Sequence, residues 1–218
     1  MNLAAMIDHT CLRPDATGDD IENLCREAIE HGFHSVCVAP SRVELAVARV
    51  AASNVRVCSV VGFPHGNTIG PARGIEAEAM LGAGAWEIDM VMNIGALKDG
   101  EDGVVAADIG IVADIVDSRP GAILKVILET ALLESDEIVR ACRIAEHSGA
   151  NFVKTSTGFG PGGATVEAVG LMKETVGDRL GVKASGGIRD YATAMAMVDA
   201  GANRLGTSSS LDIMAEAG

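Results

Sequence analysis

The sequence of 218 residues lacks a long apolar segment, and this absence excludes one class of protein. No stretch reaches the roughly 20 apolar residues that a membrane-spanning helix needs. The first residues, Met1–Asp8, also lack the basic segment followed by an apolar run that is typical of a secretory signal. We therefore expect no membrane partner and a cytoplasmic protein.

Paired cysteines and a basic cluster are missing as well. The five cysteines are odd in number and form no Cys-x-x-Cys pair, which indicates reduced thiols in the cytoplasm. Neither metal-ligand spacing nor a nucleotide-binding fingerprint is present, so we expect no metal and no cofactor. The net charge of −13 argues against a nucleic-acid partner. It does not exclude a small anionic substrate, since a local group of lysines or backbone amides can hold a phosphate.

A regular alternation of strand-like and helix-like segments runs through the chain. Eight apolar runs have strand character: Met6–Leu12, His34–Ala39, Val55–Val61, Ala85–Met90, Ala122–Leu128, Asn151–Lys154, Gly181–Ser185 and Asn203–Leu205. The segments between them repeat apolar residues at helical spacing. Strict alternation favours a parallel sheet. Eight units in a chain of this length predict an α/β protein, a single-domain (β/α)8 TIM barrel over residues 1–218. An open, doubly wound sheet is the alternative.

Glycines and capping residues mark the expected ends of the helices. Gly32, Gly84, Gly149 and Gly201 each precede a strand directly, and glycine suits the left-handed position that follows a helix. Three N-terminal caps are predicted from polar side chains that precede apolar helical patterns. They are a Ser41–Glu44 capping box, Ser135 or Asp136, and Asp190 ahead of the helix Ala192–Ala200.

Polar residues that fall at or near the ends of strands are the candidates for chemistry, because active sites of such barrels lie at the C-terminal ends of the strands. Asp8 and Thr10 belong to the first strand, Asp89 to the fourth, and Lys125, Lys154 and Lys183 to the fifth, sixth and seventh. Burying an ammonium group without a partner costs several kcal/mol. Three lysines on neighbouring strands therefore indicate a functional cluster rather than core packing.

Such a cluster suits an amine nucleophile. An amine must be uncharged to attack, yet at a pKa near 10.4 only about one lysine in two thousand is neutral at pH 7. A second ammonium group nearby, together with desolvation, lowers the pKa of the first. Lys154 and Lys183, one strand apart, are placed for this effect, and Lys125 or Asp89 would balance the remaining charge.

Two glycine-rich loops follow the last two strands. Lys183–Arg189 contains Gly186 and Gly187, and Gly206–Ser210 contains Ser208 and Ser209. Loops in these positions of a barrel often bind phosphate through backbone N–H groups. We expect a phosphate site there, with ordinary turn glycines and a cap serine as the alternative. Cys37, near the end of the second strand, either lines the site or packs in the core.

The chain resembles the deoxyribose-phosphate aldolases at these same residues. The matching segments are Ile7–Thr10, Glu87–Gly95, Leu124–Thr130, Val153–Phe159, Val182–Arg189 and Gly206–Ser209. The resemblance implies a class I aldolase without a cofactor, commonly a homodimer. Such an enzyme reversibly cleaves 2-deoxy-D-ribose 5-phosphate to D-glyceraldehyde 3-phosphate and acetaldehyde.

The resemblance also implies roles for individual residues. Lys154 would form the Schiff base, Lys183 would be its cationic neighbour, and Asp89 would exchange protons through a water molecule. Lys125 would be an ionic partner in the same cluster. The implied substrate contacts are Asp8, Thr10, Cys37, Lys125, Thr157, Gly158, Gly186, Gly187, Ser208 and Ser209. Phe159 stands where some relatives have a phosphate-contacting lysine.

Three other functions remain open on the same fold. They are a metal-dependent aldolase, a phosphosugar isomerase and a phosphosugar-binding barrel without catalytic activity. Only the Schiff-base enzyme should be inactivated by borohydride in the presence of substrate.

Overall fold

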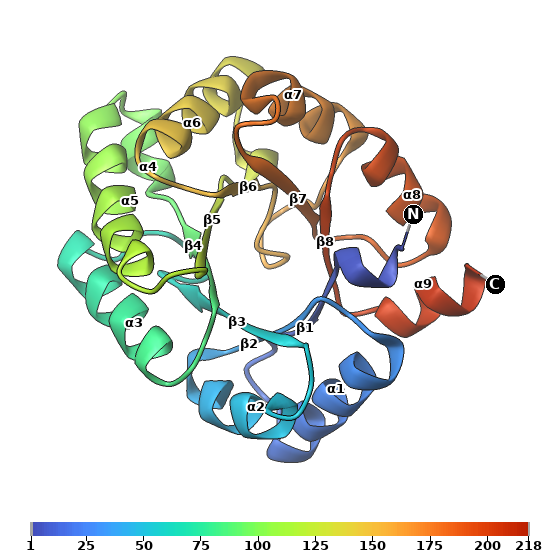
Figure 1. The fold of residues 1–218 in the computed structure, drawn as a ribbon. Coiled ribbons are helices and arrows are strands. Elements are labelled where there is room, and N and C mark those ends of the chain that lie inside the picture. Colours follow the sequence, from blue (N-terminus) through green and yellow to red (C-terminus); the bar gives the residue numbers. More distant parts are fainter. Residues whose placement is uncertain (1, 218) are drawn as a thin grey trace.

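The computed structural model describes residues 2–217 and confirms the closed (β/α)8 barrel. Eight parallel strands follow one another in chain order, and β1 pairs with β8 to close the sheet, which excludes the open alternative. Figure 1 looks along the barrel, with the helices forming a ring around the strands. The strands are β1 (Ile7–Cys11), β2 (Ser35–Val38), β3 (Arg56–Val61), β4 (Glu87–Val91), β5 (Ile123–Ile127), β6 (Phe152–Lys154), β7 (Gly181–Ser185) and β8 (Arg204–Thr207).

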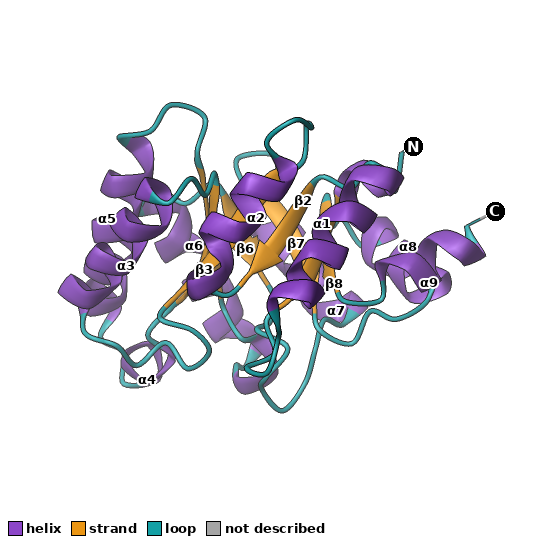
Figure 2. Cartoon of the chain, turned by 90° about the horizontal axis from the view of Figure 1, so that it is seen from below, coloured by secondary structure: helices purple, strands orange, loops and turns teal. Residues whose placement is uncertain are grey.

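The helices pack on the outer face of the sheet. They are α1 (Gly18–His31), α2 (Val43–Val50), α3 (Gly70–Gly82), α4 (Ile94–Lys98), α5 (Asp102–Asp117), α6 (Ser135–His147), α7 (Val166–Val176), α8 (Tyr191–Asp199) and α9 (Ser210–Glu216). Three short 3₁₀ turns are η1 (Ala4–Met6), η2 (Pro40–Arg42) and η3 (Thr130–Leu132). Within residues 2–217, no helix has the length and apolar character to cross a membrane. Figure 2 shows the strands enclosed between helices, with α4 at the end where the strands finish.

The predicted helix ends are partly confirmed. All four marker glycines have positive φ, and Asp190 caps α8 by accepting a hydrogen bond from the backbone N–H of Thr193. The Ser41–Glu44 capping box is wrong, because the turn η2 leads directly into α2 and its carbonyls already accept the first N–H groups. The predicted cap of α6 is also wrong, since Glu134 precedes the helix and forms the capping box with Glu137.

The apolar core is divided between two places. A large cluster fills the space between the sheet and the helices, where burial of each large apolar side chain contributes about 1.5–3 kcal/mol. A second, small cluster consists of Cys37, Cys58 and Val60, with Leu12 and Phe63 packed against it. These side chains come from the first three strands and the loops that follow them. The charged residues described next come mainly from the remaining strands.

Candidate active site

Charged side chains gather where the strands of the barrel face one another. Glu87 and Asp89 share a face of β4 because alternate residues of a strand point the same way. The strand register pairs Asp89 with Lys125, and Lys154 with Lys183. Asp8 on β1 and Arg204 on β8 complete a group of seven buried charged residues. The predicted lysine–aspartate cluster is therefore present, and it is larger than the sequence suggested.

Asp89 lies at the centre of this group. Its Oδ1 accepts a hydrogen bond from Lys125 Nζ at 2.8 Å, and its Oδ2 accepts from Lys154 Nζ and Lys183 Nζ, each at 2.8 Å. Burial alone would raise the pKa of the Asp89 carboxyl, but the three ammonium groups hold it well below its usual value. The carboxylate is therefore ionised and shared by the two lysines that were expected to act together.

Lys183 is held by a second carboxylate. Its Nζ donates to Asp8 as well as to Asp89, and Asp8 also accepts from Ser35 Oγ at 2.7 Å and Arg204 Nη1 at 2.9 Å. Burial works against the charge of Lys183, but the two carboxylates raise the pKa of its amine above the usual value. Burial likewise opposes ionisation of Asp8, and its cationic neighbours nevertheless lower the pKa of that carboxyl. Lys183 thus remains an ammonium group.

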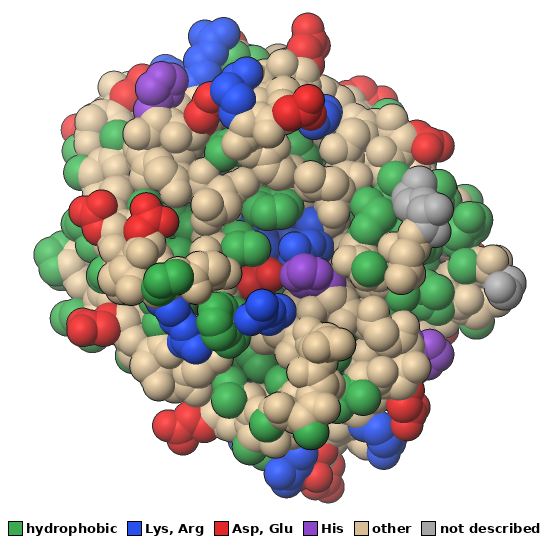
Figure 3. Space-filling view, viewed as in Figure 1, with side chains coloured by type: hydrophobic (Ala, Val, Ile, Leu, Met, Phe, Trp, Pro, Cys, Tyr) green, Lys and Arg blue, Asp and Glu red, His purple; other side chains and the backbone are tan. Residues whose placement is uncertain are grey.

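Glu87 extends the charged group toward the N-terminal end of the barrel. Its carboxylate lies 2.6 Å from Lys125 Nζ and 3.0 Å from Arg204 Nη1, and it is 2.9 Å from His34 Nε2. Burial opposes its ionisation, yet Lys125 and its other partners lower the pKa of Glu87 to about 2. Figure 3 shows the end of the barrel opposite to the pocket described below, where acidic, basic and histidine side chains meet at the centre.

Of the seven charged residues, only Lys154 lines the large cavity at the C-terminal end of the strands. The cavity has a volume of about 610 Å³. Lys154 contacts a single carboxylate, Asp89, whereas Lys125 and Lys183 each contact at least two. The group contains four basic and three acidic side chains, and Lys154 is the base with the fewest ionic partners. It is also the one that a ligand in the cavity can reach.

The cavity wall includes some of the predicted substrate contacts and leaves others out. Those that line it are Thr10, Thr157, Gly158, Gly186, Gly187 and Ser208. Asp8 and Cys37 are fully buried behind the wall. Lys125 is also fully buried, between Glu87 and Asp89, so the structure places it as an internal counter-ion and not as a substrate contact.

The loops after β6, β7 and β8 form one side of this cavity. Gly158, Gly186 and Gly187 have positive φ values of 84°, 83° and 78°, which other residues rarely adopt. In the part of the chain that the structure describes, no protein acceptor takes the backbone N–H groups of Gly158, Gly187 or Ser208. Unpaired amides that line one cavity suit an anionic group such as a phosphate.

Two details of these loops differ from the sequence prediction. The N–H of Ser209 donates to Thr207 Oγ1 at 2.9 Å, so the amide of Ser209 is used within its own loop and Ser209 does not line the cavity. Thr157 uses both its N–H and its hydroxyl to bind the Glu129 carboxylate. Thr157 therefore lines the cavity with its N–H and its hydroxyl hydrogen already used, and Glu129 holds it in place.

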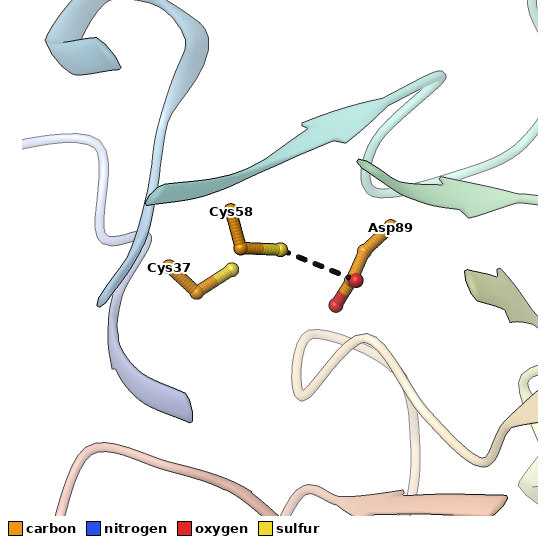
Figure 4. A group of neighbouring side chains, drawn as sticks. All are labelled: Cys37, Cys58 and Asp89. Atoms are coloured by element: carbon orange, nitrogen blue, oxygen red, sulfur yellow. Dashed lines mark hydrogen bonds between the residues drawn. The ribbon is translucent and has the colours of Figure 1, made fainter. Parts of the chain in front are cut away.

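Figure 4 shows three side chains in the barrel interior, Cys37, Cys58 and Asp89, all of which are fully buried. One ligand atom from each lies within 4.8 Å of the other two, which is close enough for the three atoms to contact one metal ion. Three separate strands supply them, so sequence spacing could not reveal the group. A divalent cation here would lie beside the three ammonium groups that already neutralise Asp89. The Cys58 thiol, 3.3 Å from Asp89 Oδ1, instead adds a further hydrogen bond to the carboxylate.

Three residues of the site were missed from the sequence. Glu87 could have been found, because it lies two positions before Asp89 in one strand and therefore on the same face. Arg204 lies in the short last strand, and nothing in the local pattern distinguishes it from a surface arginine. Glu129 has φ of 56°, a conformation that its own sequence does not signal.

Comparisons with known proteins identify similar chains. The profile of the DeoC/LacD family aldolases matches residues 3–216. A deoxyribose-phosphate aldolase from Caldanaerobacter subterraneus subsp. tengcongensis is 52% identical over 216 residues, covering 99% of this chain and 94% of the relative. One from Thermococcus gammatolerans is also 52% identical, covering 98% and 96%. The tetrameric deoxyribose phosphate aldolase of Aeropyrum pernix superposes with a TM-score of 0.92 at 34% identity, covering 98% of this chain and 89% of that one.

Proposed function

This chain belongs to the DeoC/LacD family of aldolases, and on that premise we propose that it cleaves 2-deoxy-D-ribose 5-phosphate through a Schiff base on Lys154. The products are D-glyceraldehyde 3-phosphate and acetaldehyde, and the reaction is reversible. One observation carries the mechanism: three ammonium groups share the buried Asp89 carboxylate, and only that of Lys154 reaches the cavity.

The charge balance of the cluster favours Lys154 as the amine that loses its proton. With four basic and three acidic side chains ionised, the group carries one positive charge in excess. Loss of the Lys154 proton removes this excess, and Asp89 keeps the ammonium groups of Lys125 and Lys183 as partners. Loss of the Lys183 proton would deprive both Asp8 and Asp89 of a partner. Lys154 has the fewest ionic contacts of the four bases and is the one that lines the cavity, and for these reasons it is the proposed nucleophile.

The neutral amine of Lys154 attacks C1 of the open-chain sugar, and the carbinolamine loses water to give an iminium ion. Removal of the proton from the C3 hydroxyl then breaks the C2–C3 bond, and its electron pair moves into the iminium to form an enamine. D-glyceraldehyde 3-phosphate leaves. Protonation of the enamine at C2 and hydrolysis of the resulting iminium release acetaldehyde and restore the amine.

Asp89 and Lys183 are placed to move the protons that these steps require. Asp89 Oδ2 lies 2.8 Å from both amines, so it can exchange a proton with the Lys154 nitrogen, and through an intervening water with the substrate. Lys183 remains cationic beside Asp8 and stabilises the negative charge on Asp89. The amides of Gly158, Gly187 and Ser208 bind the phosphate group.

The test is borohydride reduction in the presence of substrate, followed by mass analysis of the labelled peptide. Borohydride with substrate should abolish acetaldehyde release and add the reduced two-carbon or five-carbon fragment to Lys154. Lys154→Ala should lose at least about 10³-fold in kcat, in line with removal of a covalent nucleophile. Lys173→Ala, which removes a surface lysine paired with Asp178, is the matched control and should keep full activity.

Each rival predicts a different result. A metal-dependent aldolase would lose activity with a chelator and survive borohydride. An isomerase would convert a phosphosugar without a trapped adduct, and a binding protein would take up the sugar without releasing acetaldehyde. Retention of activity in Lys154→Ala would refute the proposed mechanism.

We also propose that the chain works in the cytoplasm as a homodimer or a larger homo-oligomer. All five cysteines are free, which supports a reducing compartment. The Aeropyrum pernix relative is tetrameric. Light scattering across a concentration series tests the assembly, and a constant monomer mass would refute it.

A further inference from the structure

A buried histidine that the proposed mechanism does not use connects β1, α1 and the loop after β8. His9 is 3% exposed, and its Nδ1 lies 2.8 Å from Ser210 Oγ. Its Nε2 lies 2.8 Å from the Glu27 carboxylate. Ser210 is fully buried at the start of α9. The three side chains thus form a continuous chain of hydrogen bonds between two helices of the barrel.

The chemistry of these partners fixes where the protons lie. An ionised carboxylate only accepts hydrogen bonds, so Nε2 of His9 donates its hydrogen to Glu27. Burial lowers the pKa of His9, although the hydrogen bond to Glu27 opposes this, and the ring is therefore neutral at neutral pH. In a neutral ring with hydrogen on Nε2, Nδ1 can only accept. The hydroxyl of Ser210 consequently donates to His9 at 2.8 Å rather than to the carbonyl of Thr207, which lies 3.4 Å from the same oxygen, and its orientation is fixed by the position of the ring.

The order serine, histidine and carboxylate is also that of hydrolase triads. Here the hydroxyl of Ser210 is fully buried and does not line the cavity, so it cannot attack a substrate. The hydrogen bonds between Glu27, His9 and Ser210 therefore hold the neighbouring residues in position and take no part in nucleophilic attack.

The position of His9 shows which segment its hydrogen bonds hold in place, the loop after β8. Its backbone pairs with that of Thr207 across the β1–β8 junction, and both residues line the cavity together with Ser208. Thr207 Oγ1 donates to the carbonyl of Ile188 in the loop after β7, at 2.7 Å. Ser208 is therefore fixed on one side by Thr207 and on the other by Ser210, which His9 holds. Ser208 carries one of the unpaired amides of the predicted phosphate site.

We propose that His9, oriented by Glu27, is a positioning residue that holds the loop Thr207–Ser210 in the conformation that recognises the phosphate group of the substrate. This inference rests on the proposed function only for the identity of the sugar, because an anion alone can report on the loop. The hydrogen bond between His9 and Ser210 should therefore affect affinity for phosphorylated ligands, without affecting the chemistry at Lys154.

The experiment compares Ser210→Ala, which removes a single oxygen atom, with Ser210→Thr, which keeps the hydroxyl. Ser118→Ala, which removes a surface hydroxyl distant in the chain, is the matched control. Steady-state kinetics are measured with 2-deoxyribose 5-phosphate and with unphosphorylated 2-deoxyribose. Calorimetry measures binding of inorganic phosphate to the same proteins, and thermal unfolding verifies that each variant is folded.

In Ser210→Ala we expect KM for the phosphorylated sugar and Kd for inorganic phosphate to rise about tenfold, as for loss of one hydrogen bond that orders a binding loop. We expect kcat, and kcat/KM for the unphosphorylated sugar, to stay within about twofold of the wild type. Ser210→Thr should restore most of the phosphate affinity. His9→Phe should raise Kd similarly, and combining it with Ser210→Ala should add little, because both changes break one interaction.

Two results would overturn this inference. One is an equal loss of kcat/KM for both sugars in Ser210→Ala, which would indicate a general structural role. The other is an unchanged Kd for inorganic phosphate in both single variants. If wild-type protein released acetaldehyde from neither sugar, the proposed function would fail, while the phosphate titrations would still decide the role of His9.

Discussion

Replacement of Asp89 by asparagine tests whether the interior cluster is ionised as inferred. The carboxylate is fully buried and accepts hydrogen bonds from three ammonium groups and from the thiol of Cys58. An asparagine of the same shape has one acceptor oxygen, and its NH₂ group would face donors. Four basic side chains would then share only two carboxylates. Removal of one partner from a buried ion pair costs about 3–5 kcal/mol, because the remaining charge is left uncompensated.

This cost should be visible in thermal unfolding. For a domain of this size, each kcal/mol lowers Tm by roughly 2–4 °C, so Asp89→Asn should lower Tm by about 10 °C. The pKa of Asp89 lies well below its usual value, so the carboxylate is charged in both folded and unfolded chains above pH 5. The loss of stability should therefore be the same from pH 5 to pH 8. Acetaldehyde release should fall by at least about 10³-fold, since the proposed proton acceptor is removed.

Asp178→Asn is the matched control, because Asp178 is fully exposed in its ion pair with Lys173. Solvent-exposed ion pairs contribute little to stability, so this variant should unfold within about 2 °C of the wild type and keep its activity. If Asp89→Asn also unfolded within about 2 °C of the wild type, the three ammonium groups would not depend on this carboxylate, and the inference would be refuted.

Two further predictions concern Glu87 and Phe159. The pKa of Glu87 is about 2 in the folded chain against an ordinary 4.5, so its stabilising contribution is complete above pH 4.5 and is lost as the pH falls toward 2. Glu87→Gln should lower the free energy of unfolding at pH 7 and should make it fall less steeply between pH 4.5 and pH 2, as measured by urea titrations at a series of pH values. An equally steep fall in the variant and the wild type would contradict the lowered pKa of Glu87. Phe159 is 50% exposed at the cavity wall. Phe159→Lys should lower KM for the phosphorylated sugar about three- to tenfold at low salt, less at high salt, and leave unphosphorylated 2-deoxyribose unaffected; equal effects on both sugars would contradict a phosphate contact.

The barrel could be predicted because each strand and helix is signalled by its own local pattern. All eight strands lie within or overlap the predicted segments. The general rule that barrel active sites lie at the C-terminal ends of the strands indicated the end that carries the large cavity. The predicted caps failed at α2 and α6, where a 3₁₀ turn and a glutamate take the place of the expected side chains. These choices depend on how the preceding loop enters the helix, which short sequence motifs do not determine.

The partners inside the barrel could not be predicted, because they come from strands far apart in the sequence. Asp8 and Arg204 are 196 residues apart and meet only when β1 and β8 close the barrel. Strand register decides that Lys154 reaches the cavity while Lys125 is enclosed behind it. A strand-end lysine and a strand-centre lysine have the same local signal, so the residue pattern alone could not separate the proposed nucleophile from a counter-ion, and only the resemblance to the aldolases distinguished Lys154 from Lys125.

If Lys154 is the nucleophile, as proposed, the separation of these two roles explains how a barrel interior can hold so many charges and still provide a reactive amine. Lys125, Lys183 and Arg204 each contact two or more carboxylates, so their charges are compensated and stabilise the fold. Those contacts use all three carboxylates, and the remaining base, Lys154, shares a carboxylate that two other ammonium groups already neutralise. A carboxylate divided among three cations stabilises each of them less than a dedicated partner would, because the cations also repel one another. The proposed mechanism therefore places the covalent chemistry at the base that has the fewest ionic contacts and faces the cavity.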